Sequence, residues 1–232
     1  MKIAAAVKKG FILVLVLVVP GFLYYLLTSQ GKNRYKPLPF FGPKQVASTF
    51  HSVRGKTIPD TVYHTVGDFK LSDQNGLPVT LHDFDNKIVI VNFFYSHCLN
   101  VCNIVSDNIK GLLSEYEKNK LVYFASVTVD PKNDSPAALR NYAERFGRSA
   151  KWLFLTGDTG TVYNLARKGF LVDALQTGNS DFIYSDKLIL MDQDKHIRGY
   201  YTGASTSEVS RLDDEIKVLI SEELRKNDTP LY

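Results

Sequence analysis

The two cysteines of the chain, Cys98 and Cys102, have the clearest capacity for chemistry. They lie in the stretch FFYSHCLNVCN, directly behind the most β-prone run of the sequence. A cysteine pair can form a structural disulfide, cycle between dithiol and disulfide, or hold a soft metal ion as two thiolates. The residues leave these three chemistries open at this point.

The position of the pair favours reactive sulfurs. We predict that Cys98 lies where a strand ends and that Cys102 lies one turn into the following helix. Residues four apart on a helix share a face, with Cβ atoms about 5–6 Å apart. The partial positive charge of a helix N-terminus stabilises a thiolate and lowers the pKa of the thiol. A purely structural bridge is the weaker interpretation, because closing so short a loop gives little entropic stabilisation.

Copper is the metal that such a pair prefers. Thiolates select Cu(I), and two or three soft ligands satisfy it, so a third ligand is desirable but optional. Zinc is disfavoured because it requires four ligands, and the sequence has no second cluster of Cys or His at the usual spacing.

The elements that must position the pair follow from the hydrophobic pattern. Residues 87–95 (KIVIVNFFY) and 121–129 (LVYFASVTV) are continuous apolar runs, typical of strands buried on both faces of a parallel sheet. Ser135 and Pro136 mark the start of a helix over residues 135–146. The remaining pattern predicts a hairpin near residues 69–81, a helix over 103–118, a strand over 151–156, a short helix over 161–168, a hairpin from 188–191 and 197–201, and a closing helix over 206–226.

This order of elements predicts an α/β fold. Strand, helix, strand, helix implies right-handed parallel crossovers. Followed by a β-hairpin and a terminal helix, it is the thioredoxin-like order, with an extra N-terminal β-hairpin and an inserted strand and helix. Asp130 and Asp134 follow the second core strand, and Asp130-Pro131 is predicted to start a turn rather than to bind metal.

The N-terminal region predicts a membrane anchor. Residues 11–27 carry no charge, are interrupted only by Pro20 and Gly21, and are long enough to span a bilayer. No cleavage pattern of a signal peptide follows them. We therefore divide the chain into a cytoplasmic N-terminus (1–10), a transmembrane anchor (11–27), an extended tether (28–63) and a thioredoxin-like domain (64–232) on the extracytoplasmic, periplasmic side.

Composition and charge exclude one class of function. The chain has 232 residues, of which 44% are hydrophobic and 22% charged, which allows one domain with appendages. The net charge of +4 comes from scattered residues without a run of like charges. We therefore predict no nucleic-acid binding.

Several motifs together resemble the Sco/SenC family of membrane-anchored, thioredoxin-like copper proteins. They are the strand followed by Cys98-x-x-x-Cys102, then VTVDP at residues 127–131 with DSP at 134–136, then WLFLTG at 152–157. The resemblance covers about residues 68–224. It implies copper binding by the two cysteines and a distant histidine, and delivery of copper to, or thiol reduction of, the dinuclear copper centre (CuA) of cytochrome c oxidase subunit II.

The resemblance also shows where this sequence departs from the family. Cys98 and Cys102 match the copper-binding cysteines. The segment FIYSDKL at residues 182–188 places Tyr184 at the position of the histidine, and Asn103 stands where the family has a proline after the second cysteine. A neutral phenol is a poor Cu(I) ligand, because it is hard and its pKa is near 10. His97, next to the first cysteine, is the one substitute ligand that the sequence offers.

The sequence thus predicts a membrane-anchored, monomeric Sco-like metallochaperone. It would bind Cu(I), in preference to Cu(II), through Cys98 and Cys102 and deliver it to the CuA centre of the oxidase. Weakened copper binding is expected because the histidine is replaced. The alternative is a thiol-disulfide oxidoreductase, with Cys98 and Cys102 as its redox-active centre, that keeps the cysteines of the oxidase copper site reduced and binds little copper itself.

Overall fold

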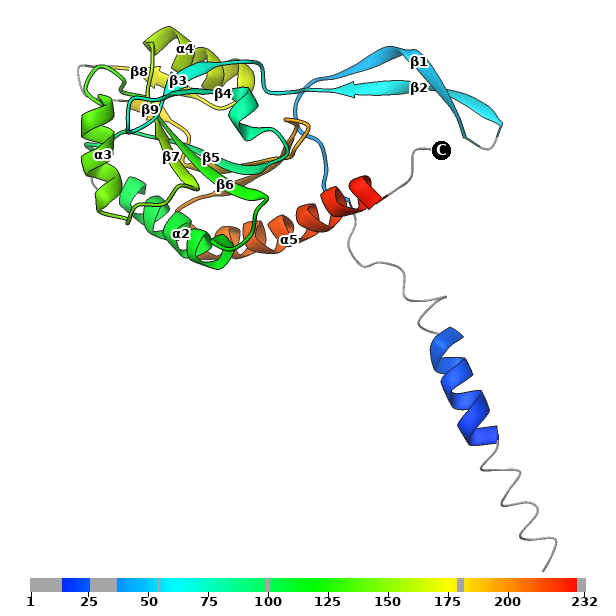
Figure 1. The fold of residues 1–232 in the computed structure, drawn as a ribbon. Coiled ribbons are helices and arrows are strands. Elements are labelled where there is room, and N and C mark those ends of the chain that lie inside the picture. Colours follow the sequence, from blue (N-terminus) through cyan, green and yellow to red (C-terminus); the bar gives the residue numbers. More distant parts are fainter. Residues whose placement is uncertain (1–13, 26–36, 54, 99–100, 179–181, 229–232) are drawn as a thin grey trace, which may run out of the picture. The chain divides into compact units, whose positions relative to one another are not determined.

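The structure is a computed structural model in which the chain divides into two units, residues 1–36 and residues 37–232. It describes residues 14–25, 37–53, 55–98, 101–178 and 182–228. Within the larger unit, a central sheet is packed between helices (Figure 1).

The described part of the smaller unit is a helix over residues 14–25 with exposed side chains. It lies inside the run predicted as an anchor; residues 11–13 and 26–27 fall outside the described residues, as does the predicted cytoplasmic N-terminus. In the described stretches of the chain, no helix combines the length and apolar character that crossing a membrane requires.

The central sheet has five strands in the order β11-β10-β5-β6-β7. The neighbours β5, β6 and β7 run parallel, while β10 is antiparallel to both β5 and β11. This topology confirms the predicted parallel half and the predicted C-terminal hairpin. The strand bounds are β5 (Ile88–Phe94), β6 (Val122–Thr128), β7 (Trp152–Leu155), β10 (Lys187–Met191) and β11 (Ile197–Thr202).

Alternate residues of β5 enter two different hydrophobic clusters. Ile88, Ile90 and Phe94 belong to one cluster, and the intervening Val89 and Val91 to the other. Every residue of the strand is buried, which explains why its sequence is a continuous apolar run rather than an alternating one. The strand that leads to Cys98 is therefore fixed from both faces.

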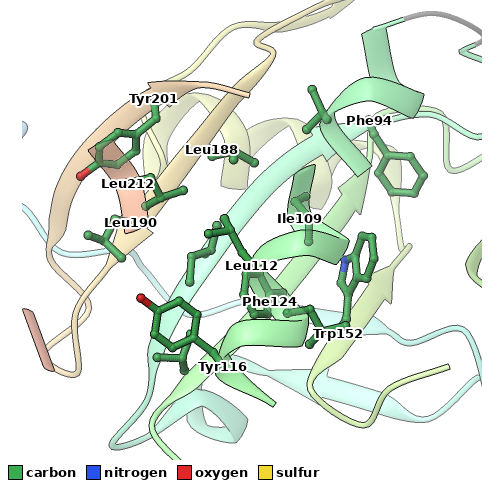
Figure 2. Packing of buried hydrophobic residues seen from close by; sticks show 14 of the residues in the cluster. Phe94, Ile109, Leu112, Tyr116, Phe124, Trp152, Leu188, Leu190, Tyr201 and Leu212 are labelled. Carbon is green, nitrogen blue, oxygen red and sulfur yellow. The ribbon is translucent and has the colours of Figure 1, made fainter. Parts of the chain in front are cut away.

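Helices cover both faces of the sheet. The first cluster joins β5 to α2 (Val101–Tyr116), α3 (Pro136–Glu144) and α5 (Thr206–Asp228), and Figure 2 shows its packing around Ile109, Leu112 and Trp152. The second cluster includes residues of α4 (Thr159–Asn164) and of the π-helical turn η2 (Leu165–Gly169) that continues it. As predicted, Ser135 caps α3, with its side chain accepting a hydrogen bond from Ala138 N.

Two small hairpins flank the sheet. The predicted one is formed by β3 (Lys70–Ser72) and β4 (Pro78–Thr80), ahead of a single 3-10 turn η1 (Leu81–Phe84). Its turn contains Gly76 at φ +79°, a conformation that glycine adopts without steric cost. The other hairpin pairs β8 (Ala174–Gln176) with β9 (Phe182–Tyr184) and was not predicted.

The predicted extended tether over residues 28–63 differs from the structure in its second half. Residues 28–36 lie outside the described residues, whereas β1 (Lys44–Val53) and β2 (Lys56–Tyr63) form an antiparallel hairpin. The prolines and aromatic residues that indicate an extended chain are equally compatible with the edge of a two-stranded ribbon, which tolerates Pro59.

Residues just ahead of this hairpin are fixed to the domain by the buried side chain of Arg198 on β11. Its guanidinium donates to the carbonyl oxygens of Leu38 (2.7 Å) and Pro39 (3.2 Å). It also forms ion pairs with Asp192 (3.1 Å) and Glu222 (2.7 Å). The Arg198 clamp, meaning these five residues, makes residue 38 the start of the folded domain.

Candidate redox and metal site

The cysteine pair lies between the end of β5 and the start of α2. Cys98 N donates to Tyr95 O (3.1 Å) in a turn after the strand, and Cys102 is the second residue of the helix. The two form a disulfide with a Cα–Cα distance of 5.8 Å. The expectation that both share one helix face is therefore replaced by a bridge from the preceding loop to the first helical turn.

The disulfide is largely enclosed at the N-terminal end of the helix. Cys98 is 7% exposed and Cys102 3% exposed, and both pack in the cluster that contains Phe94 and Val105. The N-terminal end of a helix stabilises negative charge, so the place of Cys102 in the first turn of α2 favours a thiolate there. Cys98 is the more exposed residue of the pair.

The phenol of Tyr184 contacts both sulfurs. Its Oη lies 2.9 Å from Cys102 Sγ and 3.2 Å from Cys98 Sγ. Burial, followed by the neighbouring Tyr95 and Asp186, raises the pKa of Tyr184 to about 12. The phenol therefore keeps its proton at neutral pH and can donate a hydrogen bond to a sulfur that carries negative charge.

Aromatic side chains hold Tyr184 in this position. The ring of Tyr95 meets the ring of Tyr184 edge-on, with their centroids 5.6 Å apart. The ring of Tyr95 in turn contacts the ring of Phe182, with their centroids 5.0 Å apart. Tyr95 therefore forms a wall of the site, and it also packs against the hydrophobic core. Tyr95 and Phe182 also line a cavity of about 240 Å³ together with His97, Asp130 and Asn133.

A buried carboxylate, Asp134, fixes the loop that carries Cys98. It accepts hydrogen bonds from Ser96 N (3.0 Å), from Ser96 Oγ and from Thr128 Oγ1. Its own N–H donates to Asp130 O (2.9 Å), closing the turn predicted at Asp130. Sequence reasoning missed this role of Asp134, although an acidic residue shortly after a buried strand was the signal that pointed to it.

Replacing Asp134 with alanine is expected to destabilise the fold and loosen the loop around Cys98. The change leaves the Ser96 N–H and two hydroxyls without their acceptor, and hydrogen bonds to charged groups contribute about 1.5–3 kcal/mol each. Because three such hydrogen bonds are lost, we expect the free energy of unfolding to fall by more than about 3 kcal/mol, measured by urea denaturation. Asp134→Asn, which keeps the shape and one acceptor oxygen, is the control and should lose less; equal stability of all three proteins would contradict this role.

The histidine that the sequence offered as a substitute ligand is directed to solvent. His97 is exposed, and its Nδ1 lies 3.1 Å from the hydroxyl of the adjacent Ser96.

Another compact group of potential ligands in the described residues lies elsewhere, at Asp192, Asp194 and His196. Arg198 pairs with the first of these carboxylates and Lys226 with the second. The group therefore holds its own cations and is a structural charge cluster of the β10–β11 hairpin.

The donor set at the cysteine pair suits Cu(I) better than Cu(II). Two thiolates are soft ligands that satisfy a low-coordinate Cu(I) ion. The protonated oxygen of Tyr184 adds neither a soft sulfur nor an imidazole nitrogen. Reduced Cys98 and Cys102 are therefore the residues that would hold copper as cargo.

Comparison with known proteins places this chain in a described family. The model of the SCO1/SenC family matches residues 59–220. The "SCO1 protein homolog" of Bacillus subtilis is 23% identical over 167 residues, covering 70% of this chain and 86% of that protein.

Two solved structures share the fold. ScoI of Bradyrhizobium japonicum, solved with copper bound, is 26% identical with a TM-score of 0.57 over 66% of this chain and 99% of that one. BsSco, described with a disulfide switch as a member of the Sco family of cytochrome c oxidase assembly proteins, is 23% identical with a TM-score of 0.60 over 66% of this chain and 92% of that one. The thioredoxin-like α/β fold predicted from the sequence is thereby confirmed.

Proposed function

The chain belongs to the SCO1/SenC family, and from this premise we propose that it assists assembly of the copper centre of a cytochrome c oxidase. Two relatives support this role, one solved with copper bound and one from a family of cytochrome c oxidase assembly proteins. The partner would be oxidase subunit II, whose CuA site has two cysteines that must be reduced before they bind copper. We expect the chain to act on it as a monomer.

The contact of Tyr184 Oη with both sulfurs is the observation that favours thiol-disulfide exchange over copper delivery. A protonated phenol stabilises a developing thiolate but contributes little to a copper site, and it stands where the resemblance places a histidine. We therefore infer that thiol-disulfide exchange with the partner is the principal activity. Cys98 and Cys102 are the redox pair, and Tyr184 is the donor that stabilises them.

The exchange proceeds in two displacements. In the reduced protein, the thiolate of Cys98 attacks one sulfur of a disulfide in the partner, and the other partner sulfur leaves as a thiolate and takes up a proton. The thiolate of Cys102 then attacks Cys98 Sγ, closing the internal disulfide and releasing the second partner sulfur. Two electrons pass to the partner, and a thiol reductant of the same compartment restores the dithiol.

This function is tested by mixing the reduced chain with a disulfide-bonded peptide that carries the two cysteines of a CuA site. We expect one equivalent of peptide dithiol and one equivalent of the Cys98–Cys102 disulfide to form together, as measured by mass spectrometry after alkylation. A mixture in which the peptide disulfide persists at the uncatalysed level excludes the proposal.

Removing the phenol hydroxyl by Tyr184→Phe is expected to raise the pKa of the reactive thiol. A hydrogen bond to a charged group contributes about 1.5–3 kcal/mol, and one pKa unit corresponds to about 1.4 kcal/mol, so the pKa should rise by about one to two units. The phenol of the unmodified chain, with its pKa of about 12, stays protonated throughout the titration of the thiol. The measurement is the alkylation rate of the reduced protein as a function of pH.

Tyr95→Phe is the matched control for this change, because the ring of Tyr95 contacts Tyr184 edge-on and the structure gives no sulfur contact for it among the described residues. It should leave the thiol pKa close to that of the unmodified chain. An unchanged thiol pKa in Tyr184→Phe would remove the role given to the phenol.

Copper delivery is the second candidate function, and the closeness of the two sulfurs favours it. Once reduced, Cys98 and Cys102 would bind Cu(I) as two thiolates and pass it to the partner as cargo. His97 would have to leave Ser96 and turn inward to serve as a third ligand. Both candidates use the same cysteine pair, and they differ in whether copper or electrons are transferred.

We also propose that residues 11–27 anchor the chain in a membrane, with the folded domain on the extracytoplasmic side. The apolar composition of this run and the helix at residues 14–25 support an anchor. Such a location puts the cysteine pair in an oxidising compartment, where disulfides form and a pair that cycles between dithiol and disulfide can act on them. Retention of the chain in the membrane fraction after alkaline carbonate extraction is the test.

A further inference from the structure

The two sides of the β1–β2 hairpin differ in chemistry. In the observed register, Val46 lies opposite Thr61 and Phe50 opposite Pro59, and alternate residues of a strand point to the same side. One side, named here the Phe50 side, therefore carries Val46, Phe50, Ser52, Thr57, Pro59 and Thr61, with Lys44 and Tyr63 at the base of the hairpin. The reverse side carries the exposed Ile58 and Val62, but also the ion pair of His51 with Asp60 (Nδ1–Oδ1 2.5 Å) and the charge of Lys56.

Two apolar side chains of the Phe50 side are uncovered. Val46 is 76% exposed and Phe50 63% exposed. Among the described residues, β1 and β2 pair only with each other, and Figure 1 shows them projecting from the body of the larger unit. A lone two-stranded hairpin is marginally stable in water, and an exposed apolar face is a common interaction site.

The hairpin leaves the domain at the end opposite the cysteine pair. Phe41 N donates to Ile197 O (2.9 Å), Ile197 is level with Met191, and Met191 is level with Val89 near the start of β5. Cys98 follows the other end of β5. Seven strand residues at about 3.3 Å each separate the two ends by roughly 20 Å.

The charge of the segment around the hairpin favours an anionic lipid surface over a second copy of the hairpin as the partner of this face. Residues 28–63 contain six Lys and Arg residues and a single Asp, whereas residues 64–232 contain 19 Lys and Arg against 23 Asp and Glu. A basic segment is attracted to a surface of anionic lipid, by about 1 kcal/mol for each Lys or Arg near it. Two copies of the same basic hairpin repel each other, which disfavours self-association through this face.

We propose that the Phe50 side of the hairpin lies on the surface of a bilayer containing anionic lipid. Val46 and Phe50 enter the interface between headgroups and acyl chains, and the basic residues on either side of them neutralise lipid phosphates. The inference rests on the proposed membrane anchorage. The hairpin then acts as a second membrane contact that turns the cysteine pair away from the bilayer, toward a partner.

The test places a fluorescent probe on each side of the hairpin in the full-length chain. Phe50→Trp reports on the Phe50 side, and Ile58→Trp, on the reverse side, is the matched control. Trp152 is 1% exposed and supplies a constant background. Each chain is reconstituted into phosphatidylcholine vesicles with or without phosphatidylglycerol, and its emission is compared between brominated and unbrominated lipid.

We expect brominated lipid to quench Phe50→Trp in the vesicles that contain phosphatidylglycerol, with a shift of emission to shorter wavelength, and the quenching to weaken in high salt. Ile58→Trp should keep its emission. Absence of quenching at Phe50→Trp, equal quenching at both positions, or quenching only on addition of a second protein overturns the proposal. Thiol-disulfide exchange with a soluble peptide should be unchanged in both variants. Loss of this exchange would count against the proposed function, whereas loss of quenching alone would count against the membrane contact.

Discussion

Cys98→Ser is expected to abolish reduction of the partner's disulfide. The serine hydroxyl is not ionised at neutral pH, so neither the first displacement nor the closing of the internal disulfide can occur. The rate of peptide reduction should fall to the uncatalysed background, and cells that carry the variant should lose the copper centre of the oxidase. The readouts are peptide dithiol by alkylation and the copper content of the isolated oxidase.

Cys102→Ser separates the exchange mechanism from a structural use of the bridge. The variant retains the attacking sulfur but lacks the sulfur that resolves the mixed disulfide, so a covalent complex between Cys98 and the peptide should accumulate. If the bridge were only structural, both variants would lose stability alike and neither would trap the peptide. Full oxidase assembly with Cys98→Ser would rule out both proposed functions of the pair.

Tyr184→His is expected to convert the pair into a copper site. The oxygen of Tyr184 lies 2.9 Å and 3.2 Å from the two sulfurs. An imidazole at this position would supply the nitrogen donor that Cu(II) prefers. We expect Cu(I) to bind at least about tenfold more tightly, equivalent to about 1.4 kcal/mol. A stable Cu(II) complex should also appear, where the unmodified chain forms none.

Anaerobic Cu(I) titration of the reduced chains against a chelator of known affinity measures the first effect, and electron paramagnetic resonance of the Cu(II) complex the second. Tyr184→Phe is the control, since it removes the oxygen without adding a nitrogen and should leave copper affinity low. Binding by the unmodified chain that is as tight and as competent for Cu(II) as that of Tyr184→His would restore copper delivery as the main activity.

The buried strands were predictable because their surroundings leave one kind of sequence possible. The runs at residues 87–95 and 121–129 became β5 and β6 to within a residue at each end, since strands enclosed on both faces must be apolar throughout. The helix capped by Ser135 was equally predictable from the sequence, because the capping side chain satisfies backbone groups that the helix itself leaves unpaired. Local rules were sufficient for these elements.

The hairpin β1–β2 and the role of Asp134 were not predictable from local rules. The hairpin lacks a buried face, so its sequence has no clean alternation, and its register contains an irregularity between Val46 and Phe50. Asp134 acts through Ser96, 38 residues earlier in the chain, and no spacing rule connects such a pair. The contact of Tyr184 with the sulfurs depends likewise on the path of the unpredicted strand β9.

The Arg198 clamp has a consequence for where the protein can work. Because the folded domain begins at Leu38, an anchor that ends at residue 27 would be joined to it by ten residues, which span at most about 35 Å even when fully extended. With the proposed anchor in place, a linker of that length would confine the domain to a thin layer above the membrane. The chain and the proposed oxidase subunit would then meet by lateral diffusion along the membrane. Their local concentration would be far above that of a free protein in the same compartment.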